Sequence, residues 1–207
     1  MNVRAWLRWA ERLFLAVGLV LLAIWLKNYA EERAFQGAAS RHLDAALRQN
    51  ERAGPSQPGE HPALGAPVRL EKGVLGRIEI PRLAISAVVA EGTDAGLLRR
   101  AVGHIPATAL PGRPGNVGLA GHRDTFFRGL GNVREDDLIR FVTLRGTYTY
   151  RVQWGAVVAP HRVDVLDSTA TPALTLVTCY PFHAVGSAPE RFVVRARQVA
   201  PAVEPAP

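Results

Sequence analysis

The sequence predicts an all-β protein: a closed antiparallel β-barrel of seven to eight strands with one or two short helices, preceded by an N-terminal transmembrane helix and a helical stem. Three observations lead to this prediction. An apolar run lies near the start of the 207 residues, a segment rich in proline and glycine follows, and short β-branched runs then alternate with turn residues. A hydrophobic content of 48% is sufficient to form the core of one domain.

The apolar run "LFLAVGLVLLAIWL" covers residues 13–26, with arginines before it and Lys27 after it. Because a spanning helix needs about 20 residues, a cleaved signal peptide is an alternative. No small-x-small cleavage site follows directly, and tryptophans and Tyr29 flank the run, which favours a single-pass anchor over residues 13–30. The positive charge ahead of the run predicts that residues 1–12 are cytoplasmic and that the remainder lies outside the plasma (inner) membrane.

A stem and a linker are expected between the anchor and the barrel. Residues 31–53 place apolar side chains at helical intervals among charges, which predicts an amphipathic stem helix. Residues 54–67 contain proline or glycine at nearly every second or third position, which predicts a linker. The barrel domain is therefore expected over residues 68–200, followed by a short tail at 201–207.

Short apolar runs within the barrel region predict the strands. Pro81 marks a break or an edge, Thr93 or Asp94 caps a short helix, and Arg145 and Gly146 form a hairpin turn. The predicted strands begin near Gly76, Ala84, Asn116, Asp137, Tyr148, Leu174 and Arg191.

The formal charge of +7 does not indicate a nucleic-acid-binding protein. Lysine is nearly absent, and the arginines are scattered without interleaved aromatic residues. The sequence contains no zinc-type spacing, and the acidic run at residues 135–137 is interpreted as a solvated segment that leads into a strand. No metal, no cofactor and no nucleic acid is therefore predicted as a partner.

Cys179 is the only cysteine, so it has no disulfide partner within its own chain. It ends the strand-like run "LTLVTC", and Tyr180 and Pro181 follow as turn residues. A free cysteine is often only a small buried hydrophobe. A nucleophilic cysteine, by contrast, needs a neighbouring base or positive charge to supply its thiolate.

His122 is the best candidate for that base among six histidines. It closes the run "NVGLAG", whose glycines let the chain turn sharply and bring a side chain to the rim of a sheet. His104 is expected to hydrogen bond to the backbone of a tight connection. The remaining histidines lie in the stem, the linker or loops: His42, His61, His161 and His183.

Arg191 is the candidate for positive charge, because it opens the strand that follows the cysteine loop. A hairpin brings the start of this strand back beside the end of the cysteine strand. A guanidinium group there can stabilise an oxyanion during acyl transfer. Arg195 and Arg197, farther along the same strand, are expected to be solvated on the barrel surface.

Three segments together resemble the sortases, the membrane-anchored cysteine transpeptidases of bacterial surfaces. These segments are "AGHRDTFF" (residues 120–127), "TLVTC" (175–179) and "ERFVV" (190–194), and the resemblance covers residues 76–199. The stretch "GHIPATALPGRPGNVGLAGHRDTFF" is most similar to class D.

The resemblance implies that His122, Cys179 and Arg191 are catalytic, with Thr178 as a candidate substrate-binding residue. It implies that Cys179 forms a thioacyl enzyme from a Leu-Pro-x-Thr-Gly-like C-terminal sorting signal. The acyl group then passes to an amine acceptor, such as a cell-wall precursor or a pilin lysine. The alternatives are a signal peptidase, which requires a Ser and Lys pair that the domain hardly offers, and a non-catalytic sortase-like adaptor.

Overall fold

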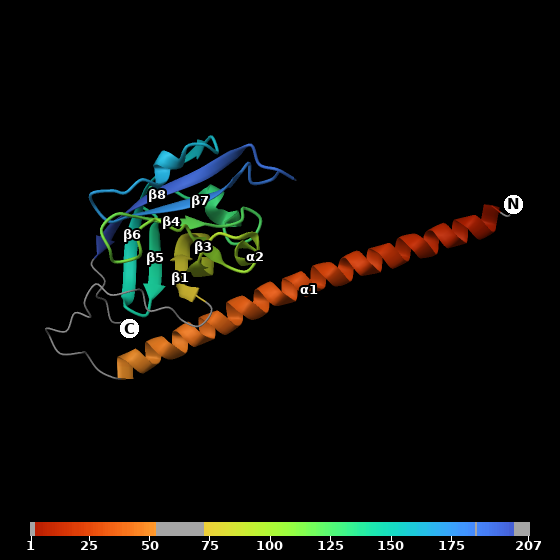
Figure 1. Ribbon diagram of the computed structural model, residues 1–207, viewed down its shortest axis with the longest axis horizontal. Coiled ribbons are helices and arrows are strands. Elements are labelled where there is room, and N and C mark those ends of the chain that lie inside the picture. Colours follow the sequence, from red (N-terminus) through yellow and green to blue (C-terminus); the bar gives the residue numbers. More distant parts are fainter. Residues whose placement is uncertain (1–2, 53–72, 185, 201–207) are drawn as a thin grey trace.

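The computed structural model describes residues 3–52, 73–184 and 186–200. An eight-stranded barrel and one long helix make up this part of the chain, and the helix crosses the side of the barrel and projects far beyond it (Figure 1). The predicted linker at 54–67, the predicted start of the barrel domain at residue 68 and the tail at 201–207 lie outside the described residues.

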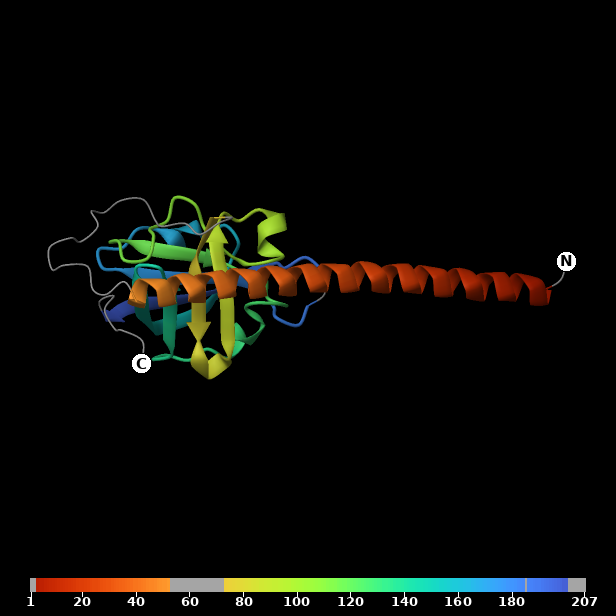
Figure 2. The same ribbon diagram turned by 90° about the horizontal axis from the view of Figure 1, so that it is seen from below.

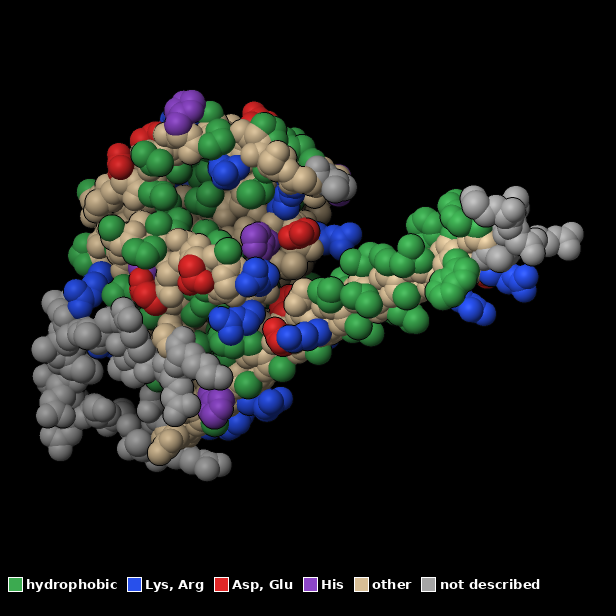
Figure 3. Space-filling model, turned by 45° about the vertical axis from the view of Figure 1, so that its right-hand side comes forward, with side chains coloured by type: hydrophobic (Ala, Val, Ile, Leu, Met, Phe, Trp, Pro, Cys, Tyr) green, Lys and Arg blue, Asp and Glu red, His purple; other side chains and the backbone are tan. Residues whose placement is uncertain are grey.

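Helix α1 (Val3–Arg52) runs through the predicted anchor and the predicted stem without a break. The sequence has no proline before Pro55, so no proline ring interrupts the backbone hydrogen bonds of α1. Large apolar side chains are exposed over its first half, and hydrophobic groups cover this part of the helix (Figure 3). Among the described residues, α1 is the one helix long and apolar enough to cross a membrane.

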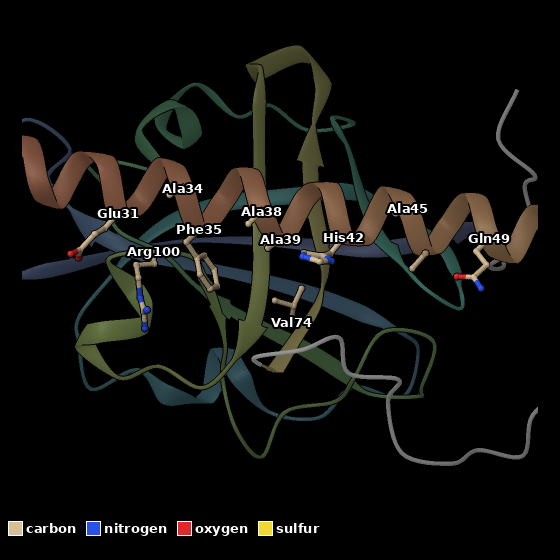
Figure 4. Close-up of a pocket in the computed structure, with 11 residues that line it drawn as sticks. Glu31, Ala34, Phe35, Ala38, Ala39, His42, Ala45, Gln49, Val74 and Arg100 are labelled. Carbon is tan, nitrogen blue, oxygen red and sulfur yellow. The ribbon is translucent and has the colours of Figure 1, made fainter.

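The second half of α1 packs against strands β1 (Val74–Ile80) and β2 (Ile85–Glu91) (Figure 2). Phe35 and Ala39 of this half pack against the cluster that contains Val74 and Val88, and Leu43 is fully buried. Gln36 accepts a hydrogen bond from the Val88 amide (2.9 Å) and donates one to the Arg100 carbonyl (2.7 Å). Figure 4 shows Phe35 on the barrel side of the helix near Arg100, whose guanidinium carbon lies 5.4 Å from the Phe35 ring centroid. The stem residues thus attach the helix to the barrel by both apolar and polar contacts.

Six further strands, one short helix and three 3-10 turns complete the barrel. The strands are β3 (Val102–His104), β4 (Asn116–Ala120), β5 (Leu138–Thr143), β6 (Gly146–Val158), β7 (Ala173–Tyr180) and β8 (Glu190–Ala200). The short elements are α2 (Ala95–Leu98), η2 (Pro81–Leu83), η3 (Arg128–Asn132) and η4 (Val163–Leu166).

The barrel is closed and has eight strands, as predicted, in the order β1-β2-β3-β4-β7-β8-β6-β5. It is mixed rather than wholly antiparallel, because β2 pairs with β3 and β4 pairs with β7 in parallel. Helix α2 lies between β2 and β3, and the β5–β6 hairpin lies between β4 and β7. Parallel neighbours need such intervening crossovers, and the alternation of apolar residues within a strand carries no information on strand direction.

Apolar side chains from all parts of the barrel fill its interior. Fully buried examples come from six different strands: Ile78, Val89, Leu119, Phe141, Tyr150 and Leu176. A close-packed interior of this kind keeps the strands in fixed positions. Side chains at the strand ends therefore have well-defined neighbours.

The structure confirms one local prediction in full, places a second one residue earlier, and contradicts a third. Asp94 caps α2, since its carboxylate accepts a hydrogen bond from the Leu97 amide at 3.0 Å. The predicted hairpin between β5 and β6 is present, but its turn is formed by Leu144 and Arg145, one residue earlier than predicted. Gly146 begins β6, with a φ of 128° that favours glycine. The tight connection predicted around His104 is wrong, because residues 102–104 form β3. Strand β3 is not predicted because it has only three residues with Gly103 in the middle, which is too short to show an alternation of apolar and polar residues.

Candidate functional site

Cys179 and Arg191 are direct partners across the antiparallel pair of β7 and β8. Leu176 on β7 belongs to the barrel core, so strand alternation puts Cys179 on the outer face of the sheet. Cys179 is half-buried there, and it is a free thiol. The hairpin argument from the sequence thus predicts the neighbourhood of these two residues correctly.

The segment that carries His122 lies beside the end of β7. Ala120, the last residue of β4, pairs with Val177 in parallel register. One residue further, the Gly121 amide donates to the Val177 carbonyl at 3.1 Å, and the Gly121 carbonyl accepts from the Thr178 hydroxyl at 2.8 Å. These bonds hold Gly121, the residue before His122, against Val177 and Thr178, the two residues before Cys179.

Thr178 lies on the inner side of β7, opposite in direction to Cys179. Thr178 is only 2% exposed, and its hydroxyl donates a hydrogen bond to the Gly121 carbonyl. This geometry does not support the expected role of Thr178 in substrate binding. Its buried hydrogen bond instead holds the chain that leads to His122.

The guanidinium of Arg191 is held near the start of β8. Its Nη1 donates to the carbonyls of Ala188 (3.2 Å) and Glu190 (2.9 Å). A guanidinium has five N–H donors in a planar fork, so contacts made by Nη1 leave donor capacity on the other nitrogens.

The 3-10 turn η4 covers part of the outer face of β4, β7 and β8. The Val165 carbonyl accepts from Arg195 Nη2 (2.7 Å), from Asn116 Nδ2 (3.2 Å) and from the Thr175 hydroxyl (3.4 Å). The prediction that Arg195 is solvated is therefore wrong, because η4 and the Trp154 ring cover it. Burial lowers the pKa of Arg195. Arg197 is exposed, as predicted.

The structure also describes four of the other five histidines. His104 is buried, and its Nε2 lies 2.9 Å from the Ala109 carbonyl, which confirms the expected backbone contact. His42, His161 and His183 are exposed. His61 falls outside the described residues.

Arg123 is a residue of this region that the sequence analysis did not identify. It is only 9% exposed, and its guanidinium donates to three carbonyls of the loop between β7 and β8. The distances are 2.9 Å to Pro181, 2.8 Å to Ala184 and 2.8 Å to Gly186. Arg123 thus ties the segment that follows His122 to the loop that joins Cys179 to Arg191.

The acidic run at residues 135–137 is less solvated than predicted. Asp137 is buried, and its Oδ2 accepts a hydrogen bond from Arg82 Nη2 at 2.6 Å. This bond with Arg82 lowers the pKa of the Asp137 carboxyl. The described part of the chain contains no group of three or more His, Cys, Asp or Glu side chains that would hold a metal ion.

Comparisons of sequence identify several related proteins. Sortase D of Bacillus subtilis is 34% identical over 125 residues, which cover 60% of this chain and 63% of that protein. Sortase A of Listeria monocytogenes is 30% identical over 110 residues, which cover 51% of this chain and 49% of that protein. The chain thus matches between about half and two thirds of the length of these relatives.

Comparisons of structure identify the same fold. A sortase A lid mutant from Corynebacterium diphtheriae aligns over 82% of this chain and 97% of its own, with a TM-score of 0.61 and 28% identity. A sortase D5 transpeptidase from Clostridium perfringens aligns over 83% and 99%, with a TM-score of 0.61 and 23% identity. The model of the sortase domain matches residues 78–199, which is more than half of the sequence and nearly the whole barrel. The chain therefore belongs to the sortase family and is most similar to class D.

Proposed function

We propose that this protein is a cysteine transpeptidase that cleaves a C-terminal sorting signal of the Leu-Pro-x-Thr-Gly kind and transfers the acyl group to an amine. The observation that carries the proposal is the direct pairing of Cys179 with Arg191 next to the segment of His122. Acyl transfer through a thioester uses a nucleophile, a general acid and base, and a donor to the oxyanion, and a thiol, an imidazole and a guanidinium can fill these three roles.

The reaction begins when the Cys179 thiolate attacks the threonine carbonyl carbon of the signal and forms a C–S bond. Arg191 donates hydrogen bonds to the oxyanion that develops on the carbonyl oxygen. The C–N bond to the next residue then breaks, and His122 gives its proton to the leaving amine. An incoming primary amine attacks the thioester, His122 accepts the proton, and the C–S bond breaks to restore the thiolate.

Two further features support this proposal. The arginines ahead of the apolar run favour a cytoplasmic N-terminus, with the barrel on the outer side of the plasma membrane. Val163 of η4 is 68% exposed at the turn that borders the outer face of β7. We assign to it a contact with the apolar residues of the sorting signal.

Mass spectrometry of the intact chain, incubated with a sorting-signal peptide, tests the proposal. We expect an acyl adduct on Cys179 that an added amine removes, and no adduct or cleavage with Cys179→Ala. Because Cys179 is half-buried rather than in the core, this variant should unfold within about 1 kcal/mol of the wild type. A folded Cys179→Ala variant that still cleaves the peptide contradicts the proposal.

Arg191→Lys tests the role of the guanidinium, since an ammonium cannot reproduce its planar fork. We expect kcat/KM to fall by about a hundredfold or more, as for loss of one oxyanion donor. Arg197→Lys on the same strand is the matched control, because Arg197 is exposed and outside the site. Activity of Arg191→Lys equal to that of the control removes Arg191 from the mechanism.

A further inference from the structure

Helix α1 connects the apolar run to the barrel without a break. The run ends at Leu26, and the same helix continues to Arg52. Besides the contacts of Gln36, the Asp44 carboxylate accepts a hydrogen bond from the Arg77 guanidinium of β1 at 2.9 Å. Because an α-helix rises by about 1.5 Å per residue, α1 fixes the distance between the apolar run and each part of the barrel beside the helix.

The segment that begins at His122 lies beside the part of α1 that directly follows the apolar run. Asn28 and Glu32 of α1 line a groove together with His122 and Phe126. A second groove again contains Glu32 and Phe126. Asn28 and Glu32 lie two and six residues beyond Leu26, about 3 and 9 Å farther along the helix axis. The segment of His122 is therefore within about 10 Å of the level at which the apolar run ends.

Cys179 lies on the same side of the barrel as this segment. The Gly121 amide and carbonyl bond to Val177 and Thr178, so the residues that follow them, His122 and Cys179, are close to one strand end. Figure 2 shows the described part of the loop between β7 and β8, in blue, on the side of the barrel toward the N-terminal end of α1. With the apolar run in a bilayer, Cys179 is thus on the membrane side of the barrel, about 10 Å beyond the run along the helix axis.

We propose that the length of α1 between the apolar run and the barrel selects donor proteins held in the same bilayer by an apolar segment after their cleavage site. The spacer between the threonine of the sorting signal and that apolar segment must span the height of Cys179. An extended chain covers about 3.3 Å per residue, so a spacer of fewer than about three residues cannot reach the thiol. A much longer flexible spacer reaches it at a lower effective concentration. This inference rests on the proposed function, because it concerns the donor of the same acyl transfer.

The test uses the full chain in phosphatidylcholine vesicles with donors that differ only in spacer length. Each donor is a sorting-signal peptide joined by a Gly/Ser spacer to an apolar helix of about 20 residues, which inserts into the same vesicle. The spacers contain one, four or sixteen residues. The cleavage rate of each donor is divided by that of a free sorting-signal peptide, because the free peptide is cleaved regardless of the height of the site.

Wild-type chain should cleave the four-residue donor fastest, since its spacer reaches about 13 Å. The one-residue donor should be slower by about tenfold or more, because its spacer cannot span the distance. The sixteen-residue donor should be slower than the four-residue donor by up to about eightfold, because its flexible spacer has a root-mean-square length of about 22 Å and spreads the signal over a larger volume.

A lengthened variant carries eleven helix-forming residues of the Glu-Ala-Ala-Ala-Lys type after Leu26. These residues make about three helical turns, so they move the barrel about 16 Å farther from the bilayer with nearly the same side toward it. The relative rate of the four-residue donor should fall by about tenfold or more, and the sixteen-residue donor should become the fastest. The matched control has the same eleven residues after Arg8, ahead of the apolar run, and should keep the wild-type order of donors.

Two results overturn the inference and leave the proposed function intact. One is a wild-type chain that cleaves the one-residue donor as fast as the four-residue donor. The other is a lengthened variant that cleaves the free peptide and keeps the wild-type order of donors. If the lengthened variant does not cleave the free peptide, the wild-type order alone decides. No cleavage of the free peptide by the wild type overturns the proposed function, and the inference with it.

Discussion

Replacement of Arg123 tests whether the loop between β7 and β8 is held in place from the His122 side. Arg123 donates three hydrogen bonds of 2.8 to 2.9 Å to loop carbonyls, and its side chain is 9% exposed. Arg123→Gln retains only two N–H donors on a shorter side chain, so it cannot reach three carbonyls at once.

The magnitude follows from the number and kind of bonds lost. A hydrogen bond to a charged group contributes about 1.5 to 3 kcal/mol, and bonds that share one group are not additive. We therefore expect loss of the Arg123 contacts to weaken docking of the loop by about 3 kcal/mol, or about a hundredfold in the equilibrium between docked and undocked loop. The loop joins Cys179 to Arg191, so kcat should fall more than KM for the peptide rises.

Hydrogen exchange and steady-state kinetics measure the two consequences. The amides of Ala184 and Gly186 should exchange faster in Arg123→Gln than in the wild type, whereas amides of the barrel core keep their protection. Arg123→Lys should recover part of kcat, because its ammonium restores charge and some donors. Unchanged exchange and unchanged kcat in Arg123→Gln, matching the exposed control Arg140→Gln, would refute the reasoning.

Three further predictions concern the rest of the molecule. The bond from Arg82 lowers the pKa of Asp137, so its stabilisation is complete above the ordinary aspartate pKa and is lost as the pH falls through the lowered one. Urea midpoints of Arg82→Gln and wild type should thus differ at pH 7 and converge at strongly acidic pH; a constant gap contradicts this. Leu43→Ala should weaken docking of α1 on the barrel by about 2 to 4 kcal/mol, since Leu43 is fully buried, and limited proteolysis of α1 should speed up; equal cleavage rates contradict it. Arg195→Met should raise KM for the peptide more than it lowers kcat, because Arg195 anchors η4 through the Val165 carbonyl; an unchanged KM contradicts this role.

The sequence is informative wherever a signal is local. Alternation of apolar residues predicts most strands, and the hairpin between them is enough to bring Arg191 opposite Cys179. The helix before the barrel can also be predicted from local signals, because no proline interrupts this part of the sequence. What the sequence does not reveal is that the predicted anchor and the predicted stem form one continuous helix, whose second half lies against β1 and β2.

Two residues, Arg195 and Arg123, are misjudged or missed for the same physical reason, which is contact between distant segments. Arg195 looks like a surface residue on an alternating strand, and only the packing of η4 across it removes it from water. Arg123 looks like a polar loop residue, and its partners lie about sixty positions away. Both arginines satisfy backbone carbonyls, which leave no signature in the sequence. The position of Arg123 directly after the strand-end His122 is the one feature of the sequence that points to its role.

Because α1 is unbroken, it also fixes the direction in which the barrel faces, around the helix axis, relative to the apolar run. An α-helix turns by about 100° per residue, so one residue inserted after Leu26 would turn the barrel by that angle around the helix axis. Seven inserted residues would return it to nearly the same facing but raise it by about 10 Å. The number of helical residues between Leu26 and Glu31 therefore determines both the direction in which the barrel faces around the helix axis and its distance from the apolar run along that axis. A flexible connection in the same place would fix neither this direction nor this distance.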